Sequence, residues 1–268
     1  MTQHAGFPHR RSDRHPVPAG LGADRYRFDQ QPRLVYWELT RACELACHHC
    51  RAEAVAHRHP LELSTAEARA VLESIRSFGR RPPHVVVTGG DPLWRPDLFD
   101  LIAYGRRLGL QVSLAPSVTD RLDRQVLRRL RQLDVATVSL SLDGDTAETH
   151  DGLRGVPGCF HRTLDMARAV VEEGLDLQIN TLVTADTLDS VKSVYRLVSE
   201  LGAMRWSLFY LIGVGRGAGL AGVRPEEAEN LLQSTVSRAY AIDKGQVVAH
   251  LDRGDLTDEN QLVRYLAV

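Results

Sequence analysis

The sequence predicts an α/β fold, a partial (β/α)6 barrel of parallel strands, and three observations carry that prediction. Apolar strand-like segments alternate with amphipathic helical segments six times, glycines follow most of the helical segments, and several strands alternate apolar with polar residues. Strict alternation of this kind requires parallel strands joined by right-handed crossovers. Eight units would close a full barrel, so six units indicate an open one.

The strands are expected where short runs of branched and aromatic residues are bounded by turn residues. They cover residues 34–39, 85–88, 110–114, 136–142, 175–183 and 204–212. The helices are expected where apolar residues recur with helical spacing, over residues 64–78, 96–108, 122–133, 160–173, 188–201 and 225–241. Ser64 followed by Glu67 has the pattern of a capping box, and glycines end four of these helices, at positions 79, 109, 174 and 202.

Three regions of the chain differ in composition. Residues 1–30 are rich in Arg, His, Pro and Gly and have no apolar periodicity, which is typical of a disordered arm. Residues 31–241 carry the alternating pattern and form the predicted core. Residues 242–268 do not continue that pattern, and we expect a short atypical tail there, made of a strand pair and a helix.

The overall composition excludes several classes of protein. The 268-residue chain has a net charge of −1 and 43% hydrophobic residues, so a large core can form and no overall positive charge favours nucleic acid. The sequence contains no apolar run long enough to span a membrane and no apolar stretch of the signal-peptide kind. We therefore expect a cytoplasmic protein, in whose reducing surroundings clustered cysteines more often bind metal than form disulfides.

Polar residues occupy one face of several predicted strands. In the fourth strand Val138 and Leu140 share one face, whereas Ser139 and Ser141 share the other, and the first and fifth strands alternate in the same way. Buried polar groups without partners are costly. A concave face lined by such groups therefore predicts a bound polar ligand, with a water-filled concavity as the alternative.

Three of the four cysteines lie close together, at Cys43, Cys47 and Cys50. Thiolates with the spacing Cys-x3-Cys-x2-Cys are typical ligands of one soft metal centre, and three ligands leave a four-coordinate site with an open position for chemistry. A structural zinc site completed by His48 or His49 is the alternative. Zinc modules commonly space two pairs of ligands a dozen or more residues apart, and this sequence does not, so the reactive centre is favoured.

The other conspicuous segments also follow predicted strands. They lie at residues 88–92, 116–117, 143–144 and 213–217. In α/β barrels the loops at the carboxyl ends of the strands build the active site. Gly89 and Gly90 fit either a tight turn or a close approach of the backbone to a ligand. The glycines of residues 213–217 lack the order Gly-x-Gly-x-x-Gly that a dinucleotide-binding module requires, so a turn is favoured there.

From about residue 33 to residue 217 the chain resembles the radical SAM superfamily. The resemblance rests on the cysteine motif after the first strand, on Gly89-Gly90-Asp91 in place of that family's Gly-Gly-Glu, and on the serine and acidic residue that end the fourth strand. It implies that Cys43, Cys47 and Cys50 hold a [4Fe–4S] cluster whose fourth iron binds S-adenosylmethionine. By the same resemblance this cofactor contacts Gly89, Gly90, Asp91, Ser141, Asp143, Arg154 and Asn180.

The activity that the resemblance implies is reductive cleavage of S-adenosylmethionine to a 5′-deoxyadenosyl radical, which abstracts hydrogen from a substrate. The implied partner is a low-potential electron donor of the flavodoxin or ferredoxin type. The motifs are most similar to the branch that makes haem variants and modifies peptides, so the expected substrate is a porphyrinoid or a peptide. Members of that branch commonly carry a C-terminal cysteine-rich module called SPASM, whereas only Cys159 lies outside the motif here. We therefore expect a single cluster; the alternative is a remnant that binds cluster and cofactor without catalysis.

Overall fold

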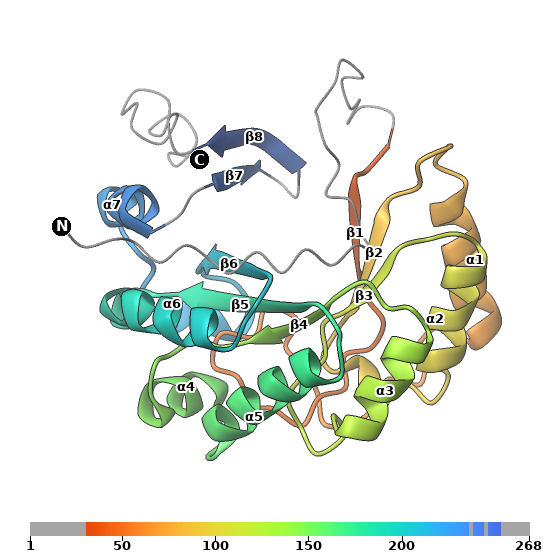
Figure 1. Cartoon of the computed structure of the whole chain (residues 1–268), viewed down its shortest axis with the longest axis horizontal. Coiled ribbons are helices and arrows are strands. Elements are labelled where there is room, and N and C mark those ends of the chain that lie inside the picture. The colour runs from red at the N-terminus through yellow and green to blue at the C-terminus, as the bar shows by residue number, and fades with distance from the viewer. Residues whose placement is uncertain (1–30, 236–237, 244–245, 253–268) are drawn as a thin grey trace.

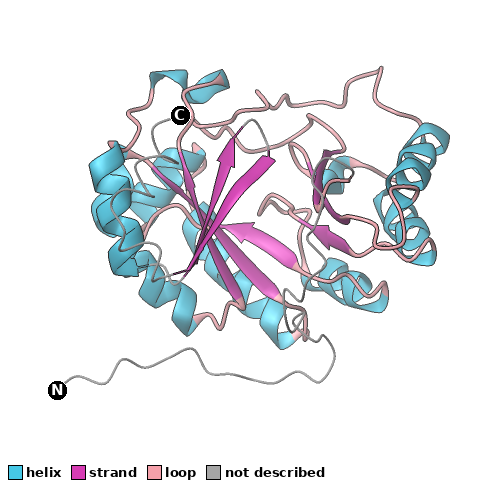
Figure 2. Ribbon diagram, turned by 90° about the horizontal axis from the view of Figure 1, so that it is seen from above, coloured by secondary structure: helices cyan, strands magenta, loops and turns pink. Residues whose placement is uncertain are grey.

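The structure, a computed structural model, describes residues 31–235, 238–243 and 246–252. Six parallel strands form one curled sheet in the order β1-β2-β3-β4-β5-β6 (Figures 1 and 2). They are β1 (Leu34–Glu38), β2 (His84–Thr88), β3 (Val112–Leu114), β4 (Val138–Ser141), β5 (Leu177–Val183) and β6 (Arg205–Tyr210). Each strand pairs with its neighbour in sequence. The predicted partial (β/α)6 barrel is confirmed.

The helices lie outside the curled sheet (Figures 1 and 2). They are α1 (Thr65–Arg76), α2 (Leu98–Arg107), α3 (Arg124–Gln132), α4 (Ala147–Arg154), α5 (Cys159–Glu172), α6 (Val191–Glu200) and α7 (Pro225–Thr235). Three short 3-10 helices are η1 (Pro92–Trp94), η2 (Ala185–Ser190) and η3 (Gly215–Gly219). The capping box expected at the start of α1 is present: the Glu67 N–H donates to the Ser64 hydroxyl, and the Ser64 N–H donates to the Glu67 carboxylate.

Apolar residues of the sheet's convex face form the core with the helices. Val138 and Leu140 of β4 and Ile179 of β5 are fully buried in one large apolar cluster. Ser139 of β4 and Asn180 of β5 alternate with these apolar residues, face the other side of the sheet and line a pocket there. The predicted alternation of apolar convex and polar concave residues is confirmed for these strands, and it positions polar groups at the open side of the barrel.

Most helix boundaries differ from the sequence prediction by one to three residues, and two differences have a visible cause. The helix expected over residues 96–108 begins at Leu98, because Pro96 and Asp97 form a turn in which the Asp97 carboxylate pairs with Arg95. The helix expected over residues 225–241 ends at Thr235, and the prediction beyond that residue is wrong. A strand, β7 (Arg238–Asp243), follows and pairs antiparallel with β8 (Gln246–Asp252). Residues of β7 pair with those of the next strand, from Asp243 with Gln246 to Arg238 with Asp252, and such cross-strand pairing can override a helical pattern in the local sequence.

One helix was missed altogether. Helix α4 has eight residues, and of these only His150 is buried, so its sequence shows no apolar stripe of helical period. The helix is stabilised at its ends instead. Thr146 and Thr149 form a capping box, and Gly155 ends the helix with a φ of +68°. Of the strand pair expected in the tail, only β8 lies within it, because most of β7 falls in the segment predicted to be helix, and the expected N-terminal arm and tail helix lie outside the described residues.

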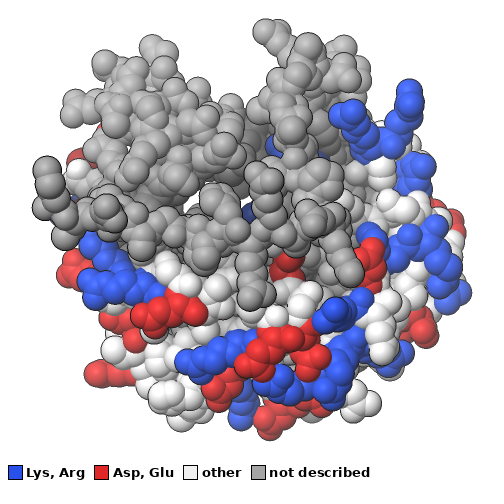
Figure 3. Space-filling model, in the orientation of Figure 1, with Lys and Arg blue, Asp and Glu red and all other residues white. Residues whose placement is uncertain are grey.

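Surface charges are mixed on the face that Figure 3 displays, where acidic and basic side chains lie side by side over the described residues. Arg124 of α3, for example, pairs with Glu172 of α5. Within the described part of the chain, no helix is long and apolar enough to cross a membrane.

Candidate functional site

A pocket of about 180 Å³ lies at the carboxyl ends of the central strands. Five of the seven residues predicted to contact a cofactor line it: Gly89, Gly90, Ser141, Arg154 and Asn180. The amide oxygen of Asn180 accepts a hydrogen bond from Gln178 at 2.8 Å, which leaves its amide nitrogen for a ligand. The predicted residues Asp91 and Asp143 do not line the pocket, and their carboxylates bind other parts of the protein.

The cysteine motif lies in the loop after β1, here called the cysteine loop (residues 40–55). Cys43 and Cys47 are buried, Cys50 is half-buried, and all three are free thiols. Each sulfur accepts from or contacts a donor: the Leu45 N–H lies 3.4 Å from Cys43 Sγ and the Ala54 N–H lies 3.4 Å from Cys50 Sγ. Among the described residues, no three Cys, His, Asp or Glu side chains converge closely enough to hold a metal ion.

Arg154 connects the cysteine loop with the end of β4. Its Nη1 lies 3.7 Å from Cys47 Sγ, and its Nη2 forms an ion pair with Asp143 Oδ2 at 2.5 Å. Its Nε is buried and has no partner among the described residues, although Arg154 lines the pocket. A buried N–H without a partner is costly, so this nitrogen fits an acidic group of a ligand. The arrangement therefore suits a soft metal beside an anionic ligand.

Asp143 lies almost wholly inside the protein. Its Oδ1 accepts from the Leu182 N–H at 2.8 Å, and its own N–H donates to His150 Nδ1 at 3.1 Å. Burial alone would raise the pKa of the Asp143 carboxyl, but the Arg154 guanidinium, the two nearby histidines and the Leu182 N–H together outweigh burial and hold that pKa below its ordinary value. Asp143 is therefore a buried carboxylate that fixes Arg154.

Two histidines next to this pair are neutral. Burial lowers the pKa of His150 to about 4 and the pKa of His49 to about 4, and the nearby Arg154 adds to both shifts. Since His150 Nδ1 accepts a hydrogen bond, its proton lies on Nε2. Neither ring brings a positive charge to the cysteine loop near neutral pH.

Asp91 joins the loop after β2 to the loop after β3. Its carboxylate accepts from the Leu93 N–H at 3.2 Å, the Ser117 N–H at 3.4 Å and the Thr119 hydroxyl at 3.1 Å. Burial raises the pKa of Asp91 to about 6. These contacts occupy the carboxylate within the protein and hold Ser117, whose hydroxyl lies 3.3 Å from Cys43 Sγ.

Gly89 and Gly90 pack against the backbone of the cysteine loop. A Cβ atom would lie 2.4 Å from the Thr40 carbonyl oxygen at Gly89 and 2.3 Å from the Ala42 carbonyl oxygen at Gly90. Gly89 also has a φ of +145°, which favours glycine. The structure shows a close approach of these glycines to the protein's own chain, which brings the pocket wall against the cysteine motif, and their expected approach to a ligand stays a prediction.

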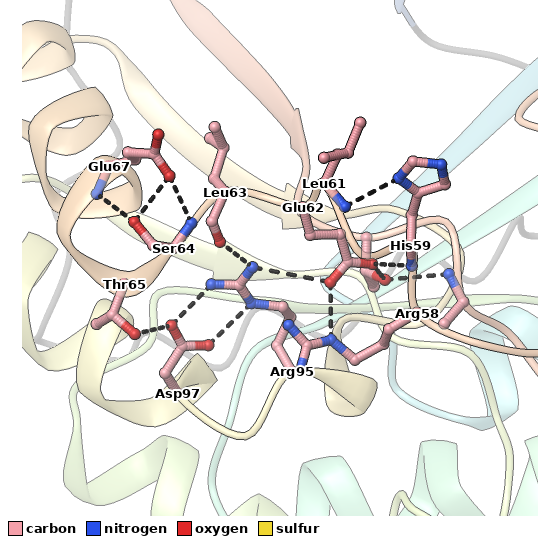
Figure 4. A network of polar contacts seen from close by, with 12 residues as sticks. Arg58, His59, Leu61, Glu62, Leu63, Ser64, Thr65, Glu67, Arg95 and Asp97 are labelled. Carbon is pink, nitrogen blue, oxygen red and sulfur yellow. Dashed lines mark hydrogen bonds and ion pairs between the residues drawn. The ribbon is translucent and has the colours of Figure 1, made fainter.

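A buried network that the sequence did not indicate holds the start of the cysteine loop (Figure 4). Arg95 is almost fully buried, binds Asp97 through two nitrogens at 2.8 and 2.7 Å, and donates to the Leu63 carbonyl oxygen at 2.6 Å. Its Nη1 also lies 3.8 Å from the Glu62 carboxylate. Glu62 in turn accepts from the Thr40 hydroxyl, which itself accepts from the N–H of Ala42.

The glycine-rich segment after β6 packs against the cysteine loop. Arg216 donates from Nε to the Cys47 carbonyl oxygen at 2.9 Å and from Nη1 to the Ala54 carbonyl oxygen at 3.3 Å. A Cβ atom at Gly215 would lie 2.7 Å from the carbonyl oxygen of Cys50, so glycine is required there. From Gly215 on, this segment forms the 3-10 helix η3 and not only the turn that the sequence favoured, and its contacts with the cysteine loop were not visible in the sequence.

Comparisons with known proteins place the chain in a family. The model of the radical SAM superfamily matches residues 37–198. The AdoMet-dependent heme synthase of Oleidesulfovibrio alaskensis is 40% identical over 240 residues, which are 85% of this chain and 61% of that protein. The pre-heme d1 synthase of Dinoroseobacter shibae is 28% identical over 88% of this chain and 56% of that protein. The chain spans about half the length of the curated relatives that it matches.

A solved structure agrees on the fold. The crystal structure of Streptococcus suis SuiB bound to S-adenosylmethionine superposes with a TM-score of 0.68 at 16% identity, over 78% of this chain and 48% of that one. The superfamily model, by contrast, matches by sequence, and its match covers more than half of the chain. The chain therefore belongs to the radical SAM superfamily.

Proposed function

We propose that this chain is a radical SAM enzyme that holds one [4Fe–4S] cluster through Cys43, Cys47 and Cys50 and binds S-adenosylmethionine in the adjacent pocket. When bound, the cluster and S-adenosylmethionine supply a reductive cleavage that yields a 5′-deoxyadenosyl radical, which removes hydrogen from a substrate. The observation that carries the proposal is the placement of three free thiols, each with a nearby hydrogen-bond donor, beside a polar pocket.

The cysteine loop fits a cluster by the chemistry of its donors. Thiolates bound to iron are stabilised by N–H groups that point at sulfur, and Leu45 and Ala54 supply such groups to Cys43 and Cys50. We propose that all three sulfurs would serve as ligands of the cluster.

The pocket residues have separate roles in the proposed site. Arg154 would bind the carboxylate of the cofactor through its unpartnered Nε, because a buried guanidinium N–H pairs strongly with an anion. Ser141 and Asn180 offer a hydroxyl and an amide to its polar groups, and the backbone at Gly89 and Gly90 forms the wall. Asp91 would act by holding this wall, and the contact of Asp143 with the cofactor stays a prediction.

We further propose a porphyrinoid substrate over a peptide. The support is the 40% identity to a protein named heme synthase, against 31% identity to proteins named mycofactocin maturase. The electron for the cleavage would come from a low-potential donor of the flavodoxin or ferredoxin type. Incubation of the loaded chain with an iron porphyrin or with peptides, followed by mass spectrometry, separates the two substrate classes.

Anaerobic reconstitution tests the proposed activity. The chain is loaded with iron and sulfide, reduced with dithionite and given S-adenosylmethionine, and 5′-deoxyadenosine is measured by chromatography. We expect the parent chain to release 5′-deoxyadenosine, Cys47→Ala to release none, and Cys159→Ser, which alters the cysteine outside the motif, to retain the cluster. A normal cluster with intact S-adenosylmethionine would indicate a non-catalytic remnant, and uptake of zinc alone would indicate a structural zinc site.

A further inference from the structure

The buried pair formed by Asp143 and Arg154 touches one of the cysteine sulfurs. We propose that this pair sets the reduction potential of the cluster, with Arg154 raising the potential and Asp143 lowering it. The inference rests on the proposed function, in which Cys47 is a cluster ligand. It assigns to the two residues a role that is separate from contact with S-adenosylmethionine.

Three elements fix the distances in this arrangement. Asp143 follows β4, Arg154 ends α4, and Cys47 lies in the cysteine loop. The guanidinium lies 2.5 Å from the carboxylate and 3.7 Å from the sulfur. Only 12% of the Arg154 side chain and 2% of the Asp143 side chain are exposed. Both charges are therefore held next to the sulfur with little solvent between them.

The sign of each effect follows from electrostatics. Reduction adds one negative charge to the cluster and its sulfur ligands. A fixed cation in contact with a ligand sulfur stabilises that charge, and a fixed anion behind the cation offsets part of the stabilisation. Because solvent is largely excluded, screening is weak and both effects persist at ordinary ionic strength.

Two further charged groups lie near the pair, Arg216 on the Cys47 carbonyl oxygen and Asp151 on the Gly158 and Phe160 N–H groups, and every variant proposed below keeps both. The remaining titratable neighbours are neutral. His49 and His150 are neutral near neutral pH, as described above. Burial raises the pKa of the Cys159 thiol, so this sulfur also stays neutral. Asp143 is held by the Leu182 N–H as well as by Arg154, so its carboxylate stays in place when the arginine is changed.

A redox titration of the cluster-loaded full chain, followed by electron paramagnetic resonance without S-adenosylmethionine, tests the inference. We expect Arg154→Gln to lower the midpoint potential and Asp143→Asn to raise it. Each shift should change the ratio of reduced to oxidised cluster about tenfold at a fixed potential, which is ~59 mV for one electron. Arg154→Lys keeps the charge and should stay closer to the parent, and the double variant should lie between the two single variants.

A matched control uses an exposed ion pair between the cysteine loop and the segment that precedes α3. Arg121 pairs with Glu44 at 3.0 Å, but the two side chains are 39% and 43% exposed, so solvent screens the charge. Arg121→Gln should therefore leave the potential unchanged. If Arg154→Gln fails to hold a cluster, Asp143→Asn and Arg154→Lys still decide the outcome.

Two results would overturn the inference. One is a parent-like potential in all variants that hold a cluster. The other is a loss of affinity for S-adenosylmethionine in Arg154→Gln with no change in potential, which would make Arg154 a cofactor ligand alone. A parent chain that assembles no cluster would instead contradict the proposed function, so the two failures are distinguishable.

Discussion

The guanidinium of Arg216 donates to the Cys47 carbonyl oxygen at 2.9 Å and so joins the segment after the last barrel strand to the loop after the first. The barrel is open between β1 and β6, because these strands do not pair. This contact bridges the opening at the level of the cysteine motif. Arg216 thus holds the cysteine loop in place across the opening that a further strand would fill in a closed barrel.

Arg216→Ala is expected to loosen the cysteine loop without unfolding the protein. The change removes donors to two carbonyl groups of the loop, each worth about 1 kcal/mol. Amide hydrogen exchange of the loop should become faster, and iron content after reconstitution should fall. Arg224→Ala removes an exposed arginine that pairs with Glu227, and it should change neither quantity. Unchanged exchange in Arg216→Ala would show that the contact does not hold the loop.

Arg95→Leu is expected to destabilise the whole chain strongly. The substitution leaves Glu62 and Asp97 with carboxylates that lose a buried cationic partner, a change that costs about 3–5 kcal/mol. Arg58→Ala removes the exposed partner of the same Glu62 and should cost less than about 1 kcal/mol. Denaturant unfolding of the two variants measures the difference. Similar losses of unfolding free energy in the two variants would contradict the view that burial makes Arg95 the key member of the network.

Gly90→Ala is expected to displace the cysteine motif. Its Cβ would lie 2.3 Å from the Ala42 carbonyl oxygen, a backbone atom that cannot move aside without shifting the loop. We expect loss of cluster binding and a lower melting temperature. Gly152→Ala places a Cβ in open space within helix α4 and should stabilise the protein by about 0.5–1 kcal/mol. A Gly90→Ala chain that binds iron like the parent would contradict this account of the glycine.

Because the pKa of Asp91 is raised, the free energy of unfolding is expected to fall as the pH rises. Burial raises the pKa of its carboxyl from 3.8 to about 6, so the folded state binds the proton more tightly than the unfolded state. The stability that this proton confers is present below about pH 4 and is lost as the pH rises through 6. Relative to Asp91→Asn, the parent should therefore lose up to about 3 kcal/mol between these pH values. Urea unfolding of both chains over this range checks the slope.

A pH-independent difference between the parent and Asp91→Asn would contradict the raised pKa. Such a result would mean that the hydrogen bonds from Leu93, Ser117 and Thr119 stabilise the carboxylate enough to offset its burial.

The strands and the cysteine motif could be predicted because they leave local patterns. Each of the six barrel strands begins and ends within two residues of its predicted bounds, since alternation and turn residues are properties of neighbouring positions. Ser64, followed by Glu67 three residues later, likewise predicted the start of α1. Five predicted cofactor residues lie in one pocket because the carboxyl ends of parallel strands meet at one edge of the sheet.

The contacts that organise the site could not be predicted in the same way. Arg95 and Glu62 lie on different loops, and no periodic pattern relates them. The pairing of Asp143 with Arg154 depends on α4, a polar helix that has no apolar stripe. The need for glycine at positions 89 and 90 arises from the backbone of the cysteine loop, which only the fold brings near.

The most direct test of the central claim is the electron paramagnetic resonance spectrum of the reduced, anaerobically reconstituted chain, before and after S-adenosylmethionine is added. We expect about four iron and four sulfide per chain and a signal that changes when the cofactor binds the open iron. A chain that takes up no iron, or a Cys47→Ala variant with the parent's iron content and signal, would contradict the claim that these cysteines hold the cluster.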